Sequence, residues 1–350
     1  MGRPSQGLGR MNARTDHLTA FLESSGWASA QITPLAGDAS NRRYDRLVHQ
    51  DGRHAVLMDA PPDKGEDVRP FINIAQFLRK RGLSAPEIFA ADEARGFLLL
   101  EDLGDDLYAR RIAADPDLEG PLYEAAVDVL TALHQVPSPL APRYSSDVST
   151  PLAALAFDWY QFGATGAVDQ DARQVFTDIF ARTLAPLDAE LDVLIQRDYH
   201  AENLLWLPDR AGAARVGLLD FQDAMTGHRA YDLVSVLQDA RRDVTPATAA
   251  AMFDRYVAQN SLETKAFSHA YALLGAQRNL RILGVFARLC LRDNKQHYID
   301  LIPRVWGHIA TNLEHPALAE IRPLIEGVLP EPDAAVLAQL KSKCGACRAL

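Results

Sequence analysis

Three polar residues between positions 196 and 223 have the types and spacing that magnesium-dependent phosphoryl transfer needs. Asp198 stands five residues before Asn203, and Asp220 follows the apolar run at 216–219. Transfer of a γ-phosphoryl group needs Mg²⁺ held against the phosphate oxygens and a carboxylate that accepts the proton of the attacking hydroxyl. Mg²⁺ prefers oxygen ligands, which Asp220 and the amide of Asn203 supply, so Asp198 is left as the base. The order Asp-x₄-Asn, apolar strand, Asp-Phe therefore predicts the catalytic loop and metal loop of a kinase.

Each half of this pattern also has a simpler structural interpretation. Asp198 and Asn203 are residue types that satisfy loop backbone groups, and Asp220 stands where a strand ends. Short motifs arise by chance often enough that either half alone favours this interpretation. Both halves together, in this order and about twenty residues apart, favour phosphoryl transfer instead.

Length, composition and charge argue against several other classes of function. The 350 residues are 48% hydrophobic, which suffices for two domains and a sizeable core. With 36 Lys and Arg against 46 Asp and Glu, the net charge of −10 argues against nucleic acid or an anionic membrane as the main partner. No run of about 18 apolar residues occurs, and the first ten residues lack the apolar core of a secretory signal.

The three cysteines, Cys290, Cys344 and Cys347, are too few for a disulfide scaffold and suit a protein of the reducing cytoplasm. Cys344 and Cys347 have the spacing of a metal or redox motif, but they stand alone near the C-terminus. A zinc site needs two more ligands. The sequence therefore assigns this pair no role.

Residues 16–100 carry the signals of a small strand-rich lobe. Residues 1–15 read as a flexible leader in which Met11 is an alternative start, and 16–29 as an amphipathic helix. Strand signals cover 31–35, 43–49 and 54–58, followed by a helix over 67–81, a fourth strand from 86 and a fifth over 95–100. Small residues at 36–41 form a turn whose backbone N–H groups can approach phosphates, although this turn alone fits a plain hairpin better.

Residues 101–104, Glu-Asp-Leu-Gly, follow the fifth strand and predict a hinge, where backbone groups of Glu101 and Leu103 pair with adenine. Residues 105–342 then read as a larger helical lobe that carries both acidic loops, and 343–350 as a tail. Helical periodicity covers 118–134, 151–162, 172–195 and nearly everything after 231. The predicted fold class is α+β, with a small antiparallel-sheet N-lobe and a larger, mainly helical C-lobe.

The order of these motifs resembles the aminoglycoside phosphotransferase and choline kinase superfamily, which has a two-lobed, protein-kinase-like fold. Within about 16–330, four stretches are similar to the bacterial N-acetylmuramate/N-acetylglucosamine anomeric kinases of cell-wall recycling. They are Gly-Asp-Ala-Ser-Asn-Arg-Arg-Tyr at 37–44, Leu-Met-Asp-Ala-Pro-Pro at 57–62, Asp-Phe-Gln-Asp-Ala at 220–224, and Gln-Arg-Asn-Leu-Arg-Ile-Leu-Gly-Val-Phe-Ala-Arg-Leu at 277–289.

The resemblance implies an enzyme that uses ATP and Mg²⁺ to phosphorylate an alcohol of a small amino sugar. Its implied site consists of Asp198 as base, Asn203 and Asp220 as metal ligands, Glu101 and Leu103 at the adenine, and Asp38, Ser40 and Asn41 over the phosphates. Gln196 replaces a histidine that often precedes the catalytic Asp, and this change should matter little because that histidine mainly supports the loop.

Met58 marks the larger departure from the superfamily pattern. Kinases usually have Val-Ala-Ile-Lys where this chain has Ala-Val-Leu-Met at 55–58, and the lysine holds the α- and β-phosphates. We expect Arg43, or its neighbour Arg42, to offset the phosphate charge because guanidinium binds phosphate bidentately, with Lys64 as the alternative. A strand arginine is otherwise a solvated side chain. Without a compensating cation, the chain would be a pseudokinase that binds nucleotide only.

The acceptor site is expected in the helical lobe, near Asp198. The candidate sugar contacts are His200, Glu202 and Asp223 for hydroxyls, and Arg278, Arg281 and Arg288 for the lactyl carboxylate of a muramic acid. Such arginines otherwise pair with acidic neighbours on a helix face. Tyr231 and Asp232 are expected to brace the loop at 196–203. An aminoglycoside- or choline-type kinase is the alternative, but its cationic acceptors would favour an acidic pocket.

Overall fold

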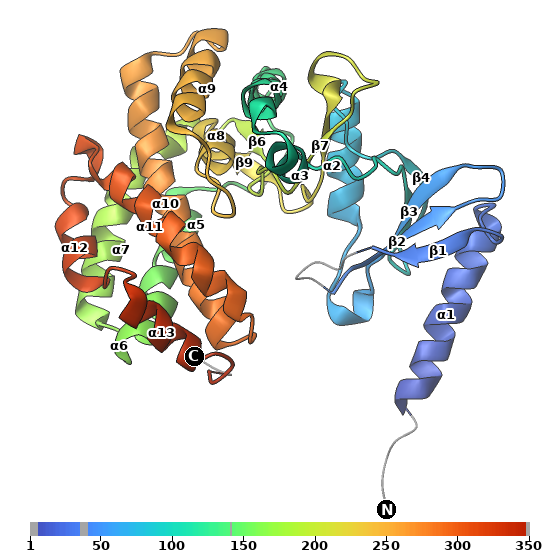
Figure 1. Cartoon of the computed structure of the whole chain (residues 1–350), viewed down its shortest axis with the longest axis horizontal. Coiled ribbons are helices and arrows are strands. Elements are labelled where there is room, and N and C mark those ends of the chain that lie inside the picture. The colour runs from blue at the N-terminus through green and yellow to red at the C-terminus, as the bar shows by residue number, and fades with distance from the viewer. Residues whose placement is uncertain (1–5, 36–40, 141, 348–350) are drawn as a thin grey trace, which may run out of the picture. The chain divides into compact units, whose positions relative to one another are not determined.

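The structure, a computed structural model, describes residues 6–35, 41–140 and 142–347. The chain divides into two compact units (Figure 1). The sheet unit comprises Met1–Asp106 and Leu205–Asp223, and the helical unit comprises Leu107–Leu204 and Ala224–Leu350. Among the described residues, no helix is both long enough and apolar enough to cross a membrane.

A five-stranded antiparallel sheet forms the sheet unit, in the order β1-β2-β3-β5-β4. Its strands are β1 (Gln31–Pro34), β2 (Arg43–Val48), β3 (His54–Asp59), β4 (Ile88–Asp92) and β5 (Phe97–Leu100), and helix α2 spans Arg69–Arg79. The register pairs Tyr44 with Met58 and Leu57 with Leu99. All five strands and the helix confirm the elements expected from the sequence, with bounds shifted by a few residues.

Helix α1 (Gln6–Ser24) differs from the leader and the helix expected over 1–15 and 16–29. It already covers residues 6–15, and Arg14 holds this part to the sheet through a hydrogen bond to Asp59 and a guanidinium 4.4 Å from the centre of the Phe97 ring. It ends at Ser24 because Gly26 takes φ +76° and Trp27 turns back to donate to the Leu22 carbonyl.

The C-terminal end of α1 lies beside the sheet (Figure 1), and its apolar side chains pack against one face of the sheet. This core consists of Phe21, Leu22, Trp27, Leu47, Ala55, Leu57, Phe97 and Leu99. Successive strand side chains point to opposite faces, so Met58 points away from the core that holds Leu57. Met58 is nevertheless only 1% exposed. At Leu57 and Met58, both faces of β3 are therefore buried.

Residues 205–223 belong to the sheet unit, although the sequence placed them in the helical lobe. The Leu218 N–H donates to the Ser84 carbonyl at 2.9 Å, and the Trp206 N–H to the Asp106 carbonyl at 2.8 Å. The segment includes β8 (Val216–Leu218), which pairs with β7 (Leu204–Trp206). These long-range hydrogen bonds tie the segment to residues that lie far from it in sequence.

Helices dominate the helical unit (Figure 1). They are α3 (Tyr108–Ala114), α4 (Glu119–Leu133), α5 (Ser146–Ala153), α6 (Phe162–Thr165), α7 (Gln170–Leu184), α8 (Ala230–Leu237), α9 (Pro246–Gln259), α10 (Thr264–Leu291), α11 (Ile302–Leu313), α12 (Arg322–Val328) and α13 (Ala334–Ser342). The 28-residue helix α10 contributes a buried face to this unit along most of its length.

The helix expected over 172–195 is wrong at its C-terminal end. Helix α7 ends at Leu184, a 3₁₀ segment spans Ala185–Glu190, and Val193–Ile195 is strand β6. This strand pairs antiparallel with β9 (Met225–Gly227). A side chain on Gly227 would lie 2.5 Å from Ile195, so glycine permits this close pairing. The helix expected over 151–162 is also interrupted, by a π-helical turn at Ala156–Gln161.

Candidate active site

The buried carboxylate of Asp232 holds the start of the loop at 196–203. The Gln196 N–H donates to one carboxylate oxygen at 2.6 Å and the Arg197 N–H to the other at 3.0 Å. Arg197 has φ +72°, a left-handed conformation that is costly for a residue other than glycine. The Ser235 hydroxyl donates to the Arg197 carbonyl at 3.3 Å. These bonds confirm that Asp232 braces the loop.

The pairing of β6 with β9 brings Asp232 to this position. Strand β6 ends at Ile195, directly before the loop, and β9 ends at Gly227, just before α8 begins at Ala230. Ile195 faces Met225 in the register, so the start of the loop lies beside the start of α8. Asp232 is in the first turn of that helix. Tyr231, which the sequence also assigned to bracing, instead lies with its hydroxyl between Tyr144 and Arg281.

Within the loop, hydrogen bonds orient the two residues with the predicted catalytic roles. The side-chain Nδ2 of Asn203 donates to the Asp198 carbonyl at 2.9 Å, which leaves its amide oxygen available as a ligand. Tyr199 is buried and its hydroxyl donates to the Ala126 carbonyl at 2.8 Å. No described residue donates a hydrogen bond to the Asp198 carboxylate. The loop thus presents one carboxylate and one amide oxygen.

His200 and Glu202 lie in different environments. His200 is 3% exposed, its Nε2 lies 3.2 Å from Nη1 of Arg241, and burial lowers its pKa well below the usual value. The predicted contact of His200 with a sugar hydroxyl stays a prediction. Glu202 is half-exposed, pairs with Arg241 at 2.9 Å and borders a cavity of about 270 Å³ beside α3. Burial raises the pKa of Glu202.

Arg278 and Arg281 on α10 lie near the Asp198 charge. Arg278 is 2% exposed, and its Nε and Nη1 have no hydrogen-bond partner among the described residues. Burial lowers the pKa of Arg278, while the charges of Tyr231, Asp198 and other groups oppose that shift. Arg281 donates from Nη1 to the Tyr231 hydroxyl at 3.3 Å. Arg288 is only partly buried, and the charges that act on it are those of Arg292, Asp293 and Arg281.

The sheet unit positions Asp220 through its neighbour Phe221. Phe221 is fully buried and stacks on Phe71 of α2, with ring centroids 4.8 Å apart. Asp220 has φ +55°, a left-handed conformation that a residue other than glycine adopts at a cost, and such strain clusters at functional sites. The Gln222 side-chain amide donates to one Asp220 oxygen at 2.6 Å. Asp223, the predicted hydroxyl contact, is exposed in the same unit.

The predicted hinge has its backbone polar groups available at the expected positions. The Glu101 N–H donates to the Glu87 carbonyl at 2.8 Å, and its carboxylate pairs with Arg210 and Arg79. Among the described residues, neither the Glu101 carbonyl nor the Leu103 N–H has a hydrogen-bond partner. The segment therefore offers an acceptor and a donor two residues apart, and the adenine contact stays a prediction.

The cations expected to replace a strand lysine differ in their partners. Arg42 pairs with Glu66 at 2.7 Å, and both side chains are mostly buried. Arg43 pairs with Asp45 at 2.9 Å but its side chain is 58% exposed. Lys64 has no ion-pair partner among the described residues, and its carbonyl accepts a bond from Asn41 at 3.2 Å. Asp38 and Ser40 lie outside the described residues.

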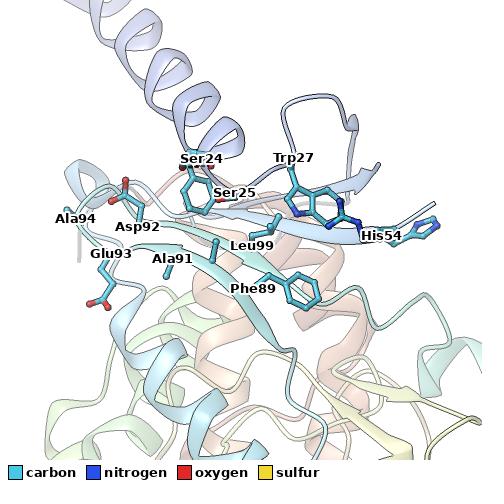
Figure 2. A pocket seen from close by; sticks show the side chains of 13 residues that line it. Ser24, Ser25, Trp27, His54, Phe89, Ala91, Asp92, Glu93, Ala94 and Leu99 are labelled. Atoms are coloured by element: carbon cyan, nitrogen blue, oxygen red, sulfur yellow. Dashed lines mark hydrogen bonds between the residues drawn. The ribbon is translucent and has the colours of Figure 1, made fainter. Parts of the chain in front are cut away.

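Sequence reasoning missed Arg241, Glu66 and Gln222, which contact predicted site residues. Arg241 and Glu66 make contacts with no local sequence signature, because Glu202 and Arg42 lie far from them along the chain. A larger cavity, of about 1040 Å³, opens in the sheet unit between the end of α1 and β4 (Figure 2). It is lined by Trp27, Phe89, Leu99 and neighbouring residues, and none of the predicted site residues lines it.

The chain belongs to the phosphotransferase enzyme family, whose model matches residues 31–267. It is therefore a phosphotransferase, as the motifs predicted. Two relatives, both called N-acetylmuramate/N-acetylglucosamine kinase, match almost the whole chain. The one from Caulobacter vibrioides is 41% identical and covers 89% of this chain and 95% of its own length. The one from Pseudomonas aeruginosa is 32% identical, and the match covers 90% of this chain and 96% of that relative.

Solved structures confirm the predicted two-lobed kinase-like α+β fold. The amicoumacin kinase hAmiN has a TM-score of 0.60 at 15% identity, with 88% of this chain and 97% of that chain covered. The choline kinase LicA from Streptococcus pneumoniae has a TM-score of 0.58 at 11% identity, with 85% and 99% covered. At these identities the likeness establishes the fold.

Replacing Asp232 with Asn should loosen the loop at 196–203. An amide offers only one acceptor oxygen, so one of the two backbone N–H groups loses its partner, at a cost of about 1–3 kcal/mol. Denaturant unfolding of D232N above pH 7, where the folded carboxyl is ionised and both of its oxygens accept, measures this loss. An unfolding free energy equal to that of the wild type would contradict the bracing role.

The pH dependence of this effect has a definite sign. Burial raises the pKa of Asp232 to about 7, well above that of an unfolded carboxyl, about 3.9. Between these values the folded protein holds a proton that the unfolded chain has released, so the contribution of Asp232 to stability falls as pH rises. Asn does not titrate. The stability advantage of wild type over D232N should therefore shrink from about pH 4 to pH 7, and unfolding curves across that range check the slope.

Proposed function

We propose that this phosphotransferase transfers the γ-phosphoryl group of ATP to the anomeric hydroxyl of N-acetylmuramate or N-acetylglucosamine. The observation that carries the proposal is the near full-length similarity to two relatives with that kinase name. The reaction would recycle cell-wall sugars in the cytoplasm, where ATP is present. The local geometry of the two acidic loops and of α10 supports it independently.

Asp198 acts as the base that accepts the proton of the sugar hydroxyl. Its carboxylate receives no hydrogen bond from the described residues, so both oxygens remain able to accept one. The bonds of Asp232 to the preceding two residues hold the backbone that carries it. General-base catalysis by a positioned carboxylate contributes about 10²–10⁴ to a rate.

Asn203 and Asp220 hold Mg²⁺. The amide oxygen of Asn203 is left free by the bond that fixes its nitrogen, and the Asp220 carboxylate is oriented by Gln222. This set of oxygen ligands suits Mg²⁺, which keeps waters and phosphate oxygens in its remaining positions. No group of three His, Cys, Asp or Glu among the described residues could hold a metal alone. When bound, Mg²⁺ neutralises charge on the phosphates.

The nucleotide is held by the hinge and by cations near the turn at 36–41. The Glu101 carbonyl accepts from the exocyclic amine of adenine and the Leu103 N–H donates to a ring nitrogen. Asn41, with Asp38 and Ser40, covers the phosphates. Of the three cations, Arg43 is exposed and, among the described residues, pairs with the nearby Asp45 alone, so it remains our candidate for the phosphate charge, with Lys64 as the alternative.

The acceptor sugar binds beside Asp198, with Glu202 and Asp223 at its hydroxyls. His200 contributes by holding the loop. Arg278 and Arg281 receive the carboxylate of N-acetylmuramate. Burying the Arg278 guanidinium, two of whose nitrogens lack partners among the described residues, costs free energy unless an anion binds to it. This positive charge also disfavours the cationic acceptors of an aminoglycoside- or choline-type kinase, which is the second candidate function.

Release of ADP from MgATP in the presence of different acceptors tests the function. We expect turnover with N-acetylmuramic acid and N-acetylglucosamine but not with glucose, choline or kanamycin, and phosphorus NMR should show an acid-labile phosphate at the anomeric carbon. The Asp198→Asn variant should lose about 10²-fold or more of kcat and keep its affinity for ATP. Turnover of choline or kanamycin would favour the second candidate, and ATP binding without turnover on any acceptor would indicate a pseudokinase.

Removing Arg43 should raise KM for ATP several-fold because one charge near the phosphates is lost. Arg53→Ala is a matched control, since Arg53 is also exposed (56%) and also pairs with an aspartate two residues away. Steady-state kinetics with saturating sugar compare the two variants. An unchanged KM in R43A would transfer the role to Lys64, which the K64A variant then tests.

Arg281→Lys should discriminate between the two sugars. Lysine keeps the charge but loses the bidentate fork, so kcat/KM should fall about tenfold or more for N-acetylmuramate and much less for N-acetylglucosamine, which lacks the carboxylate. Arg288→Lys, farther along α10, should leave the ratio unchanged. Equal losses on both sugars for R281K would show that Arg281 does not contact the carboxylate.

A further inference from the structure

The chain's three cysteines gather at the C-terminal end of α10. Cys290 lies in the last turn of α10 and is fully buried, whereas Cys344 and Cys347 follow α13 and are partly exposed. The sequence motif paired Cys344 with Cys347. The structure instead brings Cys344 to Cys290, which is 54 positions away along the chain.

Four hydrogen bonds define this contact. The Cys344 thiol donates to the Cys290 carbonyl at 3.3 Å, and the Cys290 thiol donates to the Leu340 carbonyl at 3.7 Å. The Gly345 N–H donates to the Cys290 carbonyl and the Cys347 N–H to the Leu291 carbonyl, each at 3.0 Å. The residues after α13 thus cap the end of α10, and this packing holds the Cys344 thiol against the backbone of Cys290.

The two thiols differ in their access to solutes. Burial and the neighbouring Cys344 thiol raise the pKa of Cys290 to about 12, so this group stays protonated at neutral pH. Cys344 is partly exposed, so a small oxidant reaches it first. The thiolate is the reactive form of cysteine. Cys344 is therefore the residue that an oxidant attacks, and Cys290 is the buried partner.

A metal site is a poor explanation for this cluster. Zinc or another thiophilic ion needs at least three protein ligands in a compact arrangement. Among the described residues, no group of three His, Cys, Asp or Glu has that arrangement. The Cys344 thiol is held at the Cys290 backbone, whereas Cys347 is held to the backbone of Leu291. This arrangement suits a covalent link between Cys290 and Cys344 instead.

We propose that Cys290 and Cys344 are a modification site that forms a reversible disulfide with peroxide as the oxidant. The Cys344 thiol first releases its proton, the thiolate attacks one peroxide oxygen and the O–O bond breaks. A sulfenic acid and hydroxide result, and the hydroxide takes up the released proton to become water. The Cys290 sulfur then attacks the sulfenic sulfur, the S–O bond breaks, and the Cys290 proton leaves with the hydroxide as a second water. Two electrons pass from the thiols to the peroxide, and a dithiol reductant reverses the reaction.

The disulfide fastens α13 and the residues after it to α10. Helix α10 also carries Arg278 and Arg281, nearer its middle. The link would therefore restrain the helix that bears the proposed carboxylate contacts. A cross-link that closes a loop of this length restricts the unfolded chain and should raise Tm by roughly 5 °C. The proposal does not depend on the proposed sugar substrate, because its readouts are chemical and thermal.

Mass spectrometry of the full-length protein tests the pairing. Treatment with hydrogen peroxide should lower the intact mass by about 2 Da, and a non-reduced peptide digest should contain a Cys290–Cys344 link that dithiothreitol removes. The Cys347→Ser variant keeps both partners and should form the link with the same rise in Tm. The Cys344→Ser variant, changed at a partly exposed site, should show neither.

Three results would overturn the proposal. The first is a Cys344–Cys347 link, which Cys347→Ser would abolish. The second is conversion of Cys344 to sulfinic acid while Cys290 stays free. The third is a Cys290–Cys344 link that leaves Tm unchanged, which would show that the bond does not stabilise the packing of α13 on α10.

Discussion

The candidate active site depends on one buried carboxylate, that of Asp232. It lies 36 positions after Gln196 in sequence, yet it accepts the N–H groups of Gln196 and Arg197 with its two oxygens. Buried backbone donors need partners, and the two oxygens of this one side chain satisfy both. The left-handed conformation of Arg197 is held by these bonds, and the turn they fix is the one from which Asp198 projects.

Charge balance in the helical unit follows from that carboxylate. Asp232 and Asp198 put two acidic groups in a largely buried region, where an isolated charge is costly. The positive charge of Arg278 offsets this cost, because it attracts both carboxylates. Arg278 makes no ion pair or hydrogen bond with a described residue, so no single close partner neutralises its charge. A buried arginine in this state can respond to an additional anion, which is what a carboxylated sugar would bring.

The sequence predicts local elements well and long-range partners poorly. Alternating apolar residues locate β2 and β3, and the Asp-x₄-Asn pattern locates the loop that Asp232 holds. The three residues of β6 are too few to show a period of two, so they were read as the end of a helix. The extent of α1 depends on Arg14 reaching Asp59 and Phe97, and the placement of 205–223 depends on Ser84. Contacts of this kind join residues far apart and leave no pattern in either segment.

Met58 stands where kinases usually have a lysine, and contacts between distant residues determine which other cations are available in its place. A lysine at position 58 would be buried in β3 and would need an acidic partner there. In this chain the acidic residue Glu66 binds Arg42 and the backbone of Asn41 instead. Asn41 in turn holds the backbone of Lys64, so the segments at 41–43 and 64–66 form one connected group. Arg42, Arg43 and Lys64 therefore bring positive charge to these two segments. This grouping supports our proposal that another cation takes the role that a lysine at position 58 would have.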